Sequence, residues 1–217
     1  MKTAIVIGAT GLVGSALIDL LIGDSGFSRV LVFSRRSIGR NSSKLEEHII
    51  DFDQPENWRN LVKGDVLFSC LGTTLKQAGS KEKQYQIDYT YQYQFAEAAS
   101  ENGVPFYVLV SSAGADPESR LFYSRIKGEL ERDVKRLHFS GIHFLQPSLL
   151  HGKRKDERFG EKFGYRLLKG LNAVGLFRKY RPIDGATVAK GMIAAALAEK
   201  PGVHTYTLDE IFPLARE

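Results

Sequence analysis

This sequence holds little of what would build a disulfide framework, a metal site or a membrane span. Its 217 residues include one cysteine, Cys70, which excludes an internal disulfide and a metal site made of cysteines. The five histidines show no ligand spacing. No apolar run approaches the roughly 18 residues of a membrane span, and the N-terminus lacks the charge pattern of a signal peptide. We therefore expect a cytoplasmic protein without a metal.

The hydrophobic pattern alternates between short strand-like runs and helical stretches. Strands are expected near 3–8, 29–33, 48–51, 65–70, 105–111, 142–147 and 203–208, and helices near 12–23, 55–62, 82–102, 121–139, 159–171 and 184–199. This alternation is typical of an α/β, doubly wound parallel sheet covered by helices on both faces. The length favours one domain over residues 1–217. Residues 148–183, rich in charge and glycine, are expected to form a variable segment on the substrate side.

Closely spaced glycines follow the first strand-like run. The run Thr3-Ala-Ile-Val-Ile leads into Gly8-Ala-Thr10-Gly11-Leu12-Val13-Gly14, after which a helical pattern begins. A strand, a tight glycine turn and a helix start form the cradle that binds a pyrophosphate. The spacing Gly-x-x-Gly-x-x-Gly differs from the common Gly-x-Gly-x-x-Gly, but the mechanism is the same. The turn predicts a dinucleotide cofactor, against the alternative of a purely structural turn.

The end of the second strand distinguishes the two nicotinamide cofactors. An acidic residue there would bind the ribose 2′-hydroxyl of NAD, but the window reads Phe33-Ser34-Arg35-Arg36. Guanidinium groups suit a 2′-phosphate through charge-assisted hydrogen bonds, so the sequence favours NADPH. The alternative is that both arginines are solvated loop residues. The net charge of +5 also favours an anionic ligand, which the cofactor supplies, and nucleic acid is not expected.

A second constellation lies about a hundred residues later. Tyr123 and Lys127 are four residues apart in a helical stretch, so their side chains share one face. A nearby ammonium favours the phenolate form of a tyrosine, which allows acid/base work near neutral pH. The strand at 105–111 ends in Ser111-Ser112, where a hydroxyl can donate a hydrogen bond to a substrate carbonyl. Alone, the Tyr-x-x-x-Lys pair would equally describe a packed tyrosine near a surface lysine.

Together these motifs resemble the short-chain dehydrogenase/reductase superfamily, a group of NAD(P)-binding proteins with the Rossmann fold. Four stretches narrow this resemblance to the atypical, Tat-interacting-protein-like branch of the superfamily. They are Cys70-Leu-Gly-Thr-Thr74, Lys76-Gln-Ala-Gly79, Val110-Ser-Ser-Ala-Gly-Ala-Asp116 and Phe122-Tyr-Ser-Arg-Ile-Lys-Gly-Glu129. The resemblance implies Ser112 as the group that polarises the carbonyl, Tyr123 as the acid/base, and Lys127 as the residue that tunes Tyr123 and holds the nicotinamide ribose.

The same resemblance implies further cofactor contacts. Leu71, Gly72 and Thr73 would run along the cofactor, and Asp51 and Phe52, with Asp53, would flank the adenine. Pro147 would line the nicotinamide. Two positions depart from the family: Asp88 stands near a common asparagine that relays protons, and Gln146-Pro147-Ser148 replaces Arg-Pro-Gly.

Two functions fit this sequence. The first is an NADPH-dependent reductase of a small-molecule carbonyl, in which Ser112, Tyr123 and Lys127 form the catalytic set. The second is an NADPH-binding regulatory protein or sensor with little turnover, which would act on a protein partner. The fold alone does not separate them.

Overall fold

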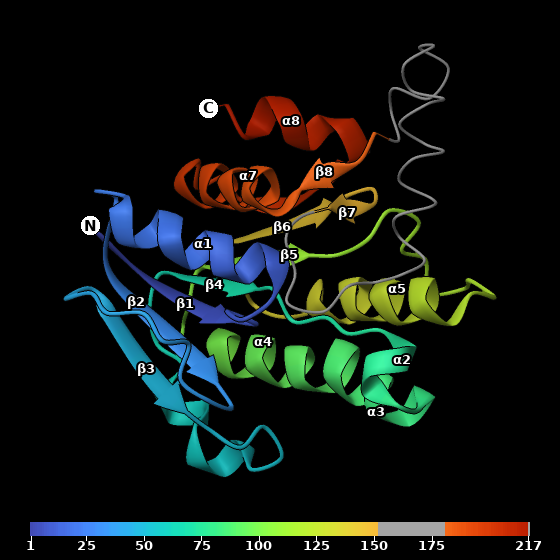
Figure 1. Ribbon diagram of the computed structural model, residues 1–217, viewed down its shortest axis with the longest axis horizontal. Helices are drawn as coiled ribbons and strands as arrows, with labels where there is room; N and C mark the ends of the chain where they lie inside the picture. The colour runs from blue at the N-terminus through green and yellow to red at the C-terminus, as the bar shows by residue number, and fades with distance from the viewer. Residues whose placement is uncertain (152–180, 217) are drawn as a thin grey trace.

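A sheet of seven parallel strands forms the centre of the computed structural model, which describes residues 1–151 and 181–216 (Figure 1). The strands are β1 (Lys2–Ile7), β2 (Phe27–Ser34), β3 (Leu45–Ile49), β4 (Val66–Ser69), β5 (Phe106–Val110), β6 (Gly141–Gln146) and β9 (Gly202–Thr207). Their order is β3-β2-β1-β4-β5-β6-β9. The chain changes direction across the sheet between β1 and β4, and such a switch point opens a ligand crevice at the carboxyl ends of the strands. The predicted doubly wound parallel sheet is confirmed.

Helices cover both faces of this sheet (Figure 1). On one face lie α1 (Leu12–Gly23) and α7 (Gly185–Leu197), and on the other α4 (Tyr91–Glu101) and α5 (Phe122–Val134). Successive residues of β1 enter opposite cores: Ala4 and Val6 pack on the side of α1, and Ile5 and Ile7 on the other side. Because both faces are covered, the strand is apolar throughout rather than alternating.

The prediction of a helix over residues 55–62 is wrong. This segment forms two short 3₁₀ turns, Pro55–Asn57 and Arg59–Leu61, separated by Trp58. The Trp58 ring is fully buried and stacks on Phe95, with ring centroids 4.0 Å apart. Its indole N–H donates to the carbonyl of Asp51 at 3.1 Å. The chain therefore bends to seat this ring in the core instead of completing a helix.

The helix expected over residues 82–102 consists of three pieces. A short helix, α3 (Lys81–Tyr85), leads into a π-helical turn at Gln86–Thr90, and α4 continues to Glu101. A preceding short helix, α2 (Leu75–Ala78), ends at Gly79. The helix predicted to reach residue 139 ends at Val134. A π turn is uncommon and is often found at functional sites.

The C-terminal part of the chain packs on the face of the sheet that α1 covers. The short strands β7 (Leu150–His151) and β8 (Ile183–Asp184) pair in parallel, and α8 (Ile211–Leu214) packs on α7. The helix predicted at 159–171, and most of the variable segment predicted at 148–183, lie outside the described residues. Within the described ranges, the model contains no helix with the length and apolar character of a membrane span.

Candidate active site

The glycine turn joins β1 to α1 at the switch point of the sheet. Gly8 has a φ of +80°, and a Cβ atom there would lie 2.4 Å from the carbonyl carbon of Cys70. A Cβ on Gly14 would lie 2.2 Å from the carbonyl oxygen of Gly8. Both glycines therefore allow backbone segments to approach closely. Gly11 differs, because its φ of −76° suits any residue and it lines an open cavity.

The first turn of α1 is suited to an anion. Gly11 is its N-cap, so no side chain caps the helix, and the first turn contains no acidic residue. The exposed N–H groups of a helix start carry partial positive charge and bind phosphate. Leu12 and Val13, whose backbone N–H groups belong to this turn, line the cavity. This arrangement fits the pyrophosphate of a dinucleotide.

A cavity of about 470 Å³ lies at the carboxyl ends of β1, β4 and β5. It is lined by Gly11, Leu12, Val13, Cys70, Leu71, Gly72, Thr73, Thr74, Leu75, Gln84, Val110, Ser111, Phe122, Tyr123, Lys127 and Leu150. The structure thus brings together the glycine turn, the segment after β4 and the start of α5, which are distant in sequence. Seven of the predicted cofactor residues are in this lining.

Helix α5 carries Tyr123 and Lys127 into the cavity on its first two turns. The Tyr123 side chain is accessible, whereas Lys127 is 1% exposed. Gly128 allows this placement, because a Cβ there would lie 2.2 Å from the backbone of Asp116 and Pro117. Within the described ranges no carboxylate pairs with the Lys127 ammonium. A buried cation without a counter-charge is costly, so the geometry suits an acceptor-rich ligand in the cavity.

Ser111 lines this cavity, whereas the predicted Ser112 does not. The Oγ atom of Ser111 is buried and has no hydrogen-bond partner among residues 1–151 and 181–216. Ser112 is absent from the cavity lining, and its Oγ donates to the carbonyl of Ala113 at 3.4 Å. Consecutive residues at a strand end point to opposite sides, so only one of the two can face the cavity. The role assigned to Ser112 stays a prediction.

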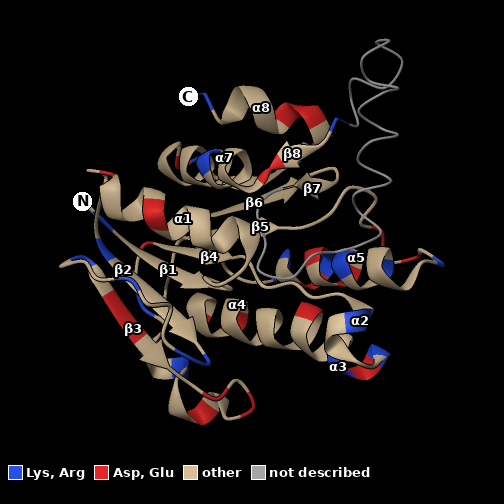
Figure 2. Cartoon of the chain, in the orientation of Figure 1, with Lys and Arg blue, Asp and Glu red and all other residues tan. Residues whose placement is uncertain are grey.

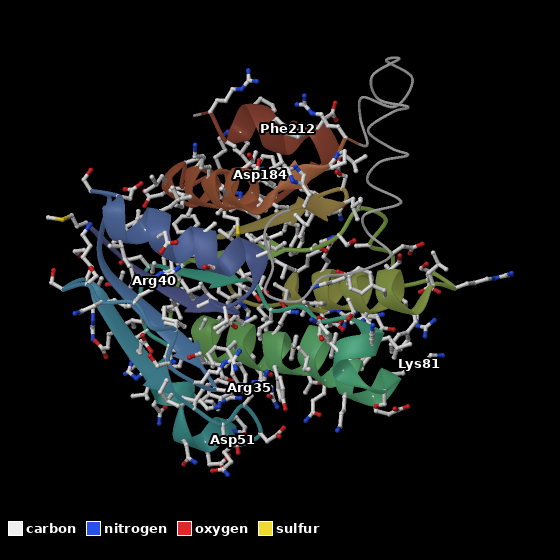
Figure 3. The ribbon with its side chains drawn as sticks, viewed as in Figure 1. Arg35, Arg40, Asp51, Lys81, Asp184 and Phe212 are labelled. Carbon is white, nitrogen blue, oxygen red and sulfur yellow. The ribbon has the colours of Figure 1, made fainter. Side chains whose placement is uncertain are left out.

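The expected adenosine side of the site is an open surface. Arg35 and Arg36 are exposed at the end of β2, and Figure 3 shows Arg35 near Asp51, which follows β3. Neither arginine forms a salt bridge with a described residue. A third arginine, Arg40, pairs with Asp19 at 2.8 Å, and this pairing raises the pKa of Arg40. Among the three arginines that follow β2, Arg35 and Arg36 are therefore the two whose guanidiniums no described carboxylate holds.

Three predicted cofactor residues have other structural roles. The Ser34 hydroxyl donates to the carbonyl of Arg36 at 2.6 Å and so shapes the turn after β2. The Phe52 ring is buried and packs on Tyr91 and Phe95, so the ring belongs to the core, and a contact of this residue with the adenine stays a prediction. Pro147 is buried, and its carbonyl accepts from the Ala113 N–H at 3.1 Å.

Asp51 and Thr10 are exposed and lie outside the cavity lining. The Asp51 carboxylate accepts from the Asp53 N–H at 3.0 Å. At the neighbouring Asp53, the carboxylate accepts from Gln86 and from the Tyr91 hydroxyl, each at 2.7 Å. These contacts hold the loop after β3 against the helix that follows β4.

The two departures from the family pattern have partners in the structure. Gln146 donates to both carboxylate oxygens of the buried Glu131, at 2.9 and 3.1 Å, which ties the end of β6 to α5. Asp88 is fully buried and accepts from the Thr73 N–H at 2.9 Å. Both therefore hold backbone segments next to the cavity.

Several lining residues escaped sequence reasoning. Thr74 and Phe122 stand in the quoted stretches without an assigned role, and Leu75 and Gln84 carry no motif for catalysis. Cys70 also lines the cavity, but burial raises its pKa to about 12, so the thiol stays protonated and is not a nucleophile. Figure 2 shows that Lys and Arg are interspersed with Asp and Glu on α3 and α5.

Comparison with known proteins identifies the family. Residues 4–129 match the model described as the NAD dependent epimerase/dehydratase family. The chain belongs to this family. The resemblance to the short-chain dehydrogenase/reductase superfamily is thereby confirmed, and the family is one of NAD-dependent enzymes.

The chain is similar to curated fungal proteins. "Protein FMP52, mitochondrial" of Saccharomyces cerevisiae is 39% identical over 206 residues, covering 89% of this chain and 87% of its own. The protein of the same name from Candida glabrata is 36% identical over 208 residues, covering 91% and 86%. These names overturn the expected cytoplasmic location. Lack of a signal-peptide pattern or a membrane span does not distinguish the cytosol from the interior of an organelle.

Solved structures share the fold at low identity. "MoeE5 in complex with UDP-glucuronic acid and NAD" superposes with a TM-score of 0.71 at 17% identity, covering 95% of this chain and 76% of that one. A UDP-N-acetylglucosamine 4-epimerase from Methanobrevibacter ruminantium M1, in complex with UDP-N-acetylmuramic acid, gives 0.70 at 19% identity, covering 98% and 80%. The cavity described above lies at the switch point of the sheet, where folds of this kind form their ligand crevice.

Proposed function

We propose that this protein is an NADPH-dependent reductase that transfers hydride to the carbonyl of a small-molecule substrate. One observation carries the proposal: a single cavity is lined by the glycine turn, the accessible Tyr123, the buried Lys127 and Ser111, and among the described residues neither the Lys127 ammonium has a counter-charge nor the Ser111 hydroxyl a hydrogen-bond partner. This set contains an anion cradle, a proton donor and a hydrogen-bond donor for a carbonyl oxygen.

Each residue has a distinct part in the proposed reaction. NADPH supplies the hydride when it is bound. Lys127 holds ribose hydroxyls and keeps positive charge beside Tyr123. Tyr123 donates its phenolic proton to the carbonyl oxygen as negative charge develops there. The Ser111 hydroxyl, which has no hydrogen-bond partner within residues 1–151 and 181–216, stabilises the same oxygen in place of the predicted Ser112.

The preference for NADPH is part of this proposal. Some of the solved neighbours, including MoeE5, carry NAD in their titles, as a property of those proteins. In this chain the end of β2 presents Arg35 and Arg36 and no carboxylate, while Arg40 is held by Asp19. Two free guanidiniums favour a 2′-phosphate over a 2′-hydroxyl.

The test is a turnover assay in which the absence of any carbonyl reduction also has a stated meaning. NADPH oxidation is followed against a panel of aldehydes, ketones and quinones for the wild type, Ser111→Ala, Ser112→Ala and Tyr123→Phe. The proposal expects a reducible carbonyl, with Ser111→Ala and Tyr123→Phe impaired and Ser112→Ala close to wild type. A wild type that binds NADPH but reduces nothing on the panel would instead support the sensor.

A further inference from the structure

A polar stripe runs along the helix that follows β4, on the side facing the sheet. Gln84, Asp88 and Gln92 are spaced four residues apart and are 4%, 0% and 0% exposed. They lie in otherwise apolar surroundings, next to Phe95 and Ala96. Buried polar groups are almost always hydrogen-bonded, so the hydrogen-bond partners of these three residues show which parts of the structure they hold.

Two members of the stripe hold one peptide unit. The Asp88 carboxylate accepts from the N–H of Thr73 at 2.9 Å, and the Gln84 amide donates to the carbonyl of Thr73 at 3.5 Å. The same amide also donates to the other oxygen of Asp88 at 3.4 Å. Asp88 therefore makes the shorter contact, and Gln84 supports both Asp88 and the peptide.

The third member has a different task. Gln92 donates to the backbone carbonyl of Asp88 at 2.7 Å and accepts from the Ser69 hydroxyl, also at 2.7 Å. It ties the helix to β4 and does not contact Thr73. Gln92 is therefore a buried amide of the same stripe, chemically similar to Gln84, that lies away from the cavity wall.

The π turn at Gln86–Thr90 contains Asp88, and Gly72 lies against it. A Cβ on Gly72 would be 3.7 Å from the Asp88 carboxylate, so the loop after β4 runs close to this oxygen. Gly72, Thr73 and Gln84 all line the cavity. The distance between Asp88 and Thr73 thus fixes the position of one cavity wall.

We infer that Asp88, supported by Gln84, is a positioning residue that clamps the Thr73 peptide so that the Gly72–Thr73 backbone forms a fixed wall for the cofactor. This inference rests on the proposed function, since it takes the cofactor to lie in this cavity. It also gives Asp88 a role other than the proton relay that the family asparagine suggested. A charged acceptor on a backbone N–H is among the stronger hydrogen bonds.

The test compares three variants of the full chain. Asp88→Asn keeps an oxygen for the Thr73 N–H, Asp88→Leu keeps the approximate size without an acceptor, and Gln92→Leu removes a buried polar group that does not touch the wall. Hydrogen exchange of the Thr73 amide reports on the clamp, and NADPH titration reports on the wall. We expect Asp88→Leu to lose amide protection and to bind NADPH about tenfold or more weakly, the scale of one lost hydrogen bond to a charged group.

Asp88→Asn should restore most of the protection of the Thr73 amide and most of the NADPH affinity. Gln92→Leu should lower stability while leaving NADPH affinity within about twofold, since it leaves the wall in place.

An unprotected Thr73 amide in the wild type overturns the inference, as does unchanged NADPH affinity in Asp88→Leu once protection is lost. A Gly11→Val control separates the two proposals. If Gly11→Val abolishes binding and Asp88→Leu does not, the clamp fails and the cofactor site stands; if the wild type binds no NADPH, the proposed function fails.

Discussion

The two ends of the crevice are built differently. At the catalytic end, Lys127 and the Ser111 hydroxyl are buried beside a partly enclosed cavity, and packing positions them. At the other end, Arg35, Arg36 and Asp51 are exposed on loops after β2 and β3. Electrostatic interactions are stronger for buried groups than on the surface, where solvent screens them. We expect the enclosed end to carry binding and chemistry and the open end to carry only cofactor preference.

The largest effect should come from the enclosed end. Tyr123→Phe removes one oxygen and keeps the ring, so carbonyl reduction should fall by about 10²–10⁴-fold, as on loss of a general acid. NADPH affinity should change little, because the phenol acts on the substrate. Steady-state rates and NADPH titration measure the two separately. Turnover at the wild-type rate would remove Tyr123 from the mechanism.

The glycine turn gives a pair of substitutions with opposite outcomes. Gly11→Val adds a side chain at the cavity on a backbone that accepts it, so the chain should fold and bind NADPH about a hundredfold more weakly. Gly8→Ala places a Cβ 2.4 Å from the Cys70 carbonyl carbon at positive φ, and should cost about 3 kcal/mol of folding free energy.

Circular dichroism melts and calorimetric titration distinguish these outcomes. Gly11→Val is the informative member of the pair, because it separates loss of the ligand from loss of the fold. Wild-type NADPH affinity in a folded Gly11→Val protein would place the cofactor elsewhere.

Lys127→Met tests whether the buried ammonium serves the ligand or the fold. Removing a buried charge that has no counter-charge in the described part of the chain, and keeping an apolar chain, should leave the ligand-free protein as stable as the wild type or more so. NADPH affinity should fall about tenfold or more, since a charged hydrogen-bond donor is lost. Thermal melts with and without NADPH show both effects. A destabilised ligand-free variant would mean that Lys127 is a structural residue.

The smallest effect should come from the open end. Arg35→Ala and Arg36→Ala should each weaken NADPH by about tenfold or less, because exposed charges are screened, and leave NADH affinity unchanged. Arg40→Ala is the matched control, since that guanidinium is already held by Asp19. Titration of both cofactors at two salt concentrations measures the preference. Equal weakening of NADPH and NADH would assign these arginines to the pyrophosphate instead.

The same contrast explains what the sequence could predict. Local patterns indicated the sheet, the glycine turn and the Tyr123–Lys127 pair, because each depends on residues close together in the chain. The choice between Ser111 and Ser112 depends on which face a strand end presents, and a shift of one residue reverses it. Asp88 could not be assigned, because its partner, the Thr73 N–H, is a backbone group without a sequence signal. The helix predicted around Trp58 does not form, because the packing of this ring in the tertiary core decides the local backbone.

Hydride transfer itself provides the most direct test of the proposed function. NADPH deuterated at the transferring position is incubated with the wild-type protein and the carbonyl panel, and the products are analysed by mass spectrometry. Our proposal predicts an alcohol one mass unit heavier than the product formed with unlabelled NADPH, and its absence in Tyr123→Phe over the same period. A wild type that binds NADPH and yields no labelled alcohol from any carbonyl would contradict it.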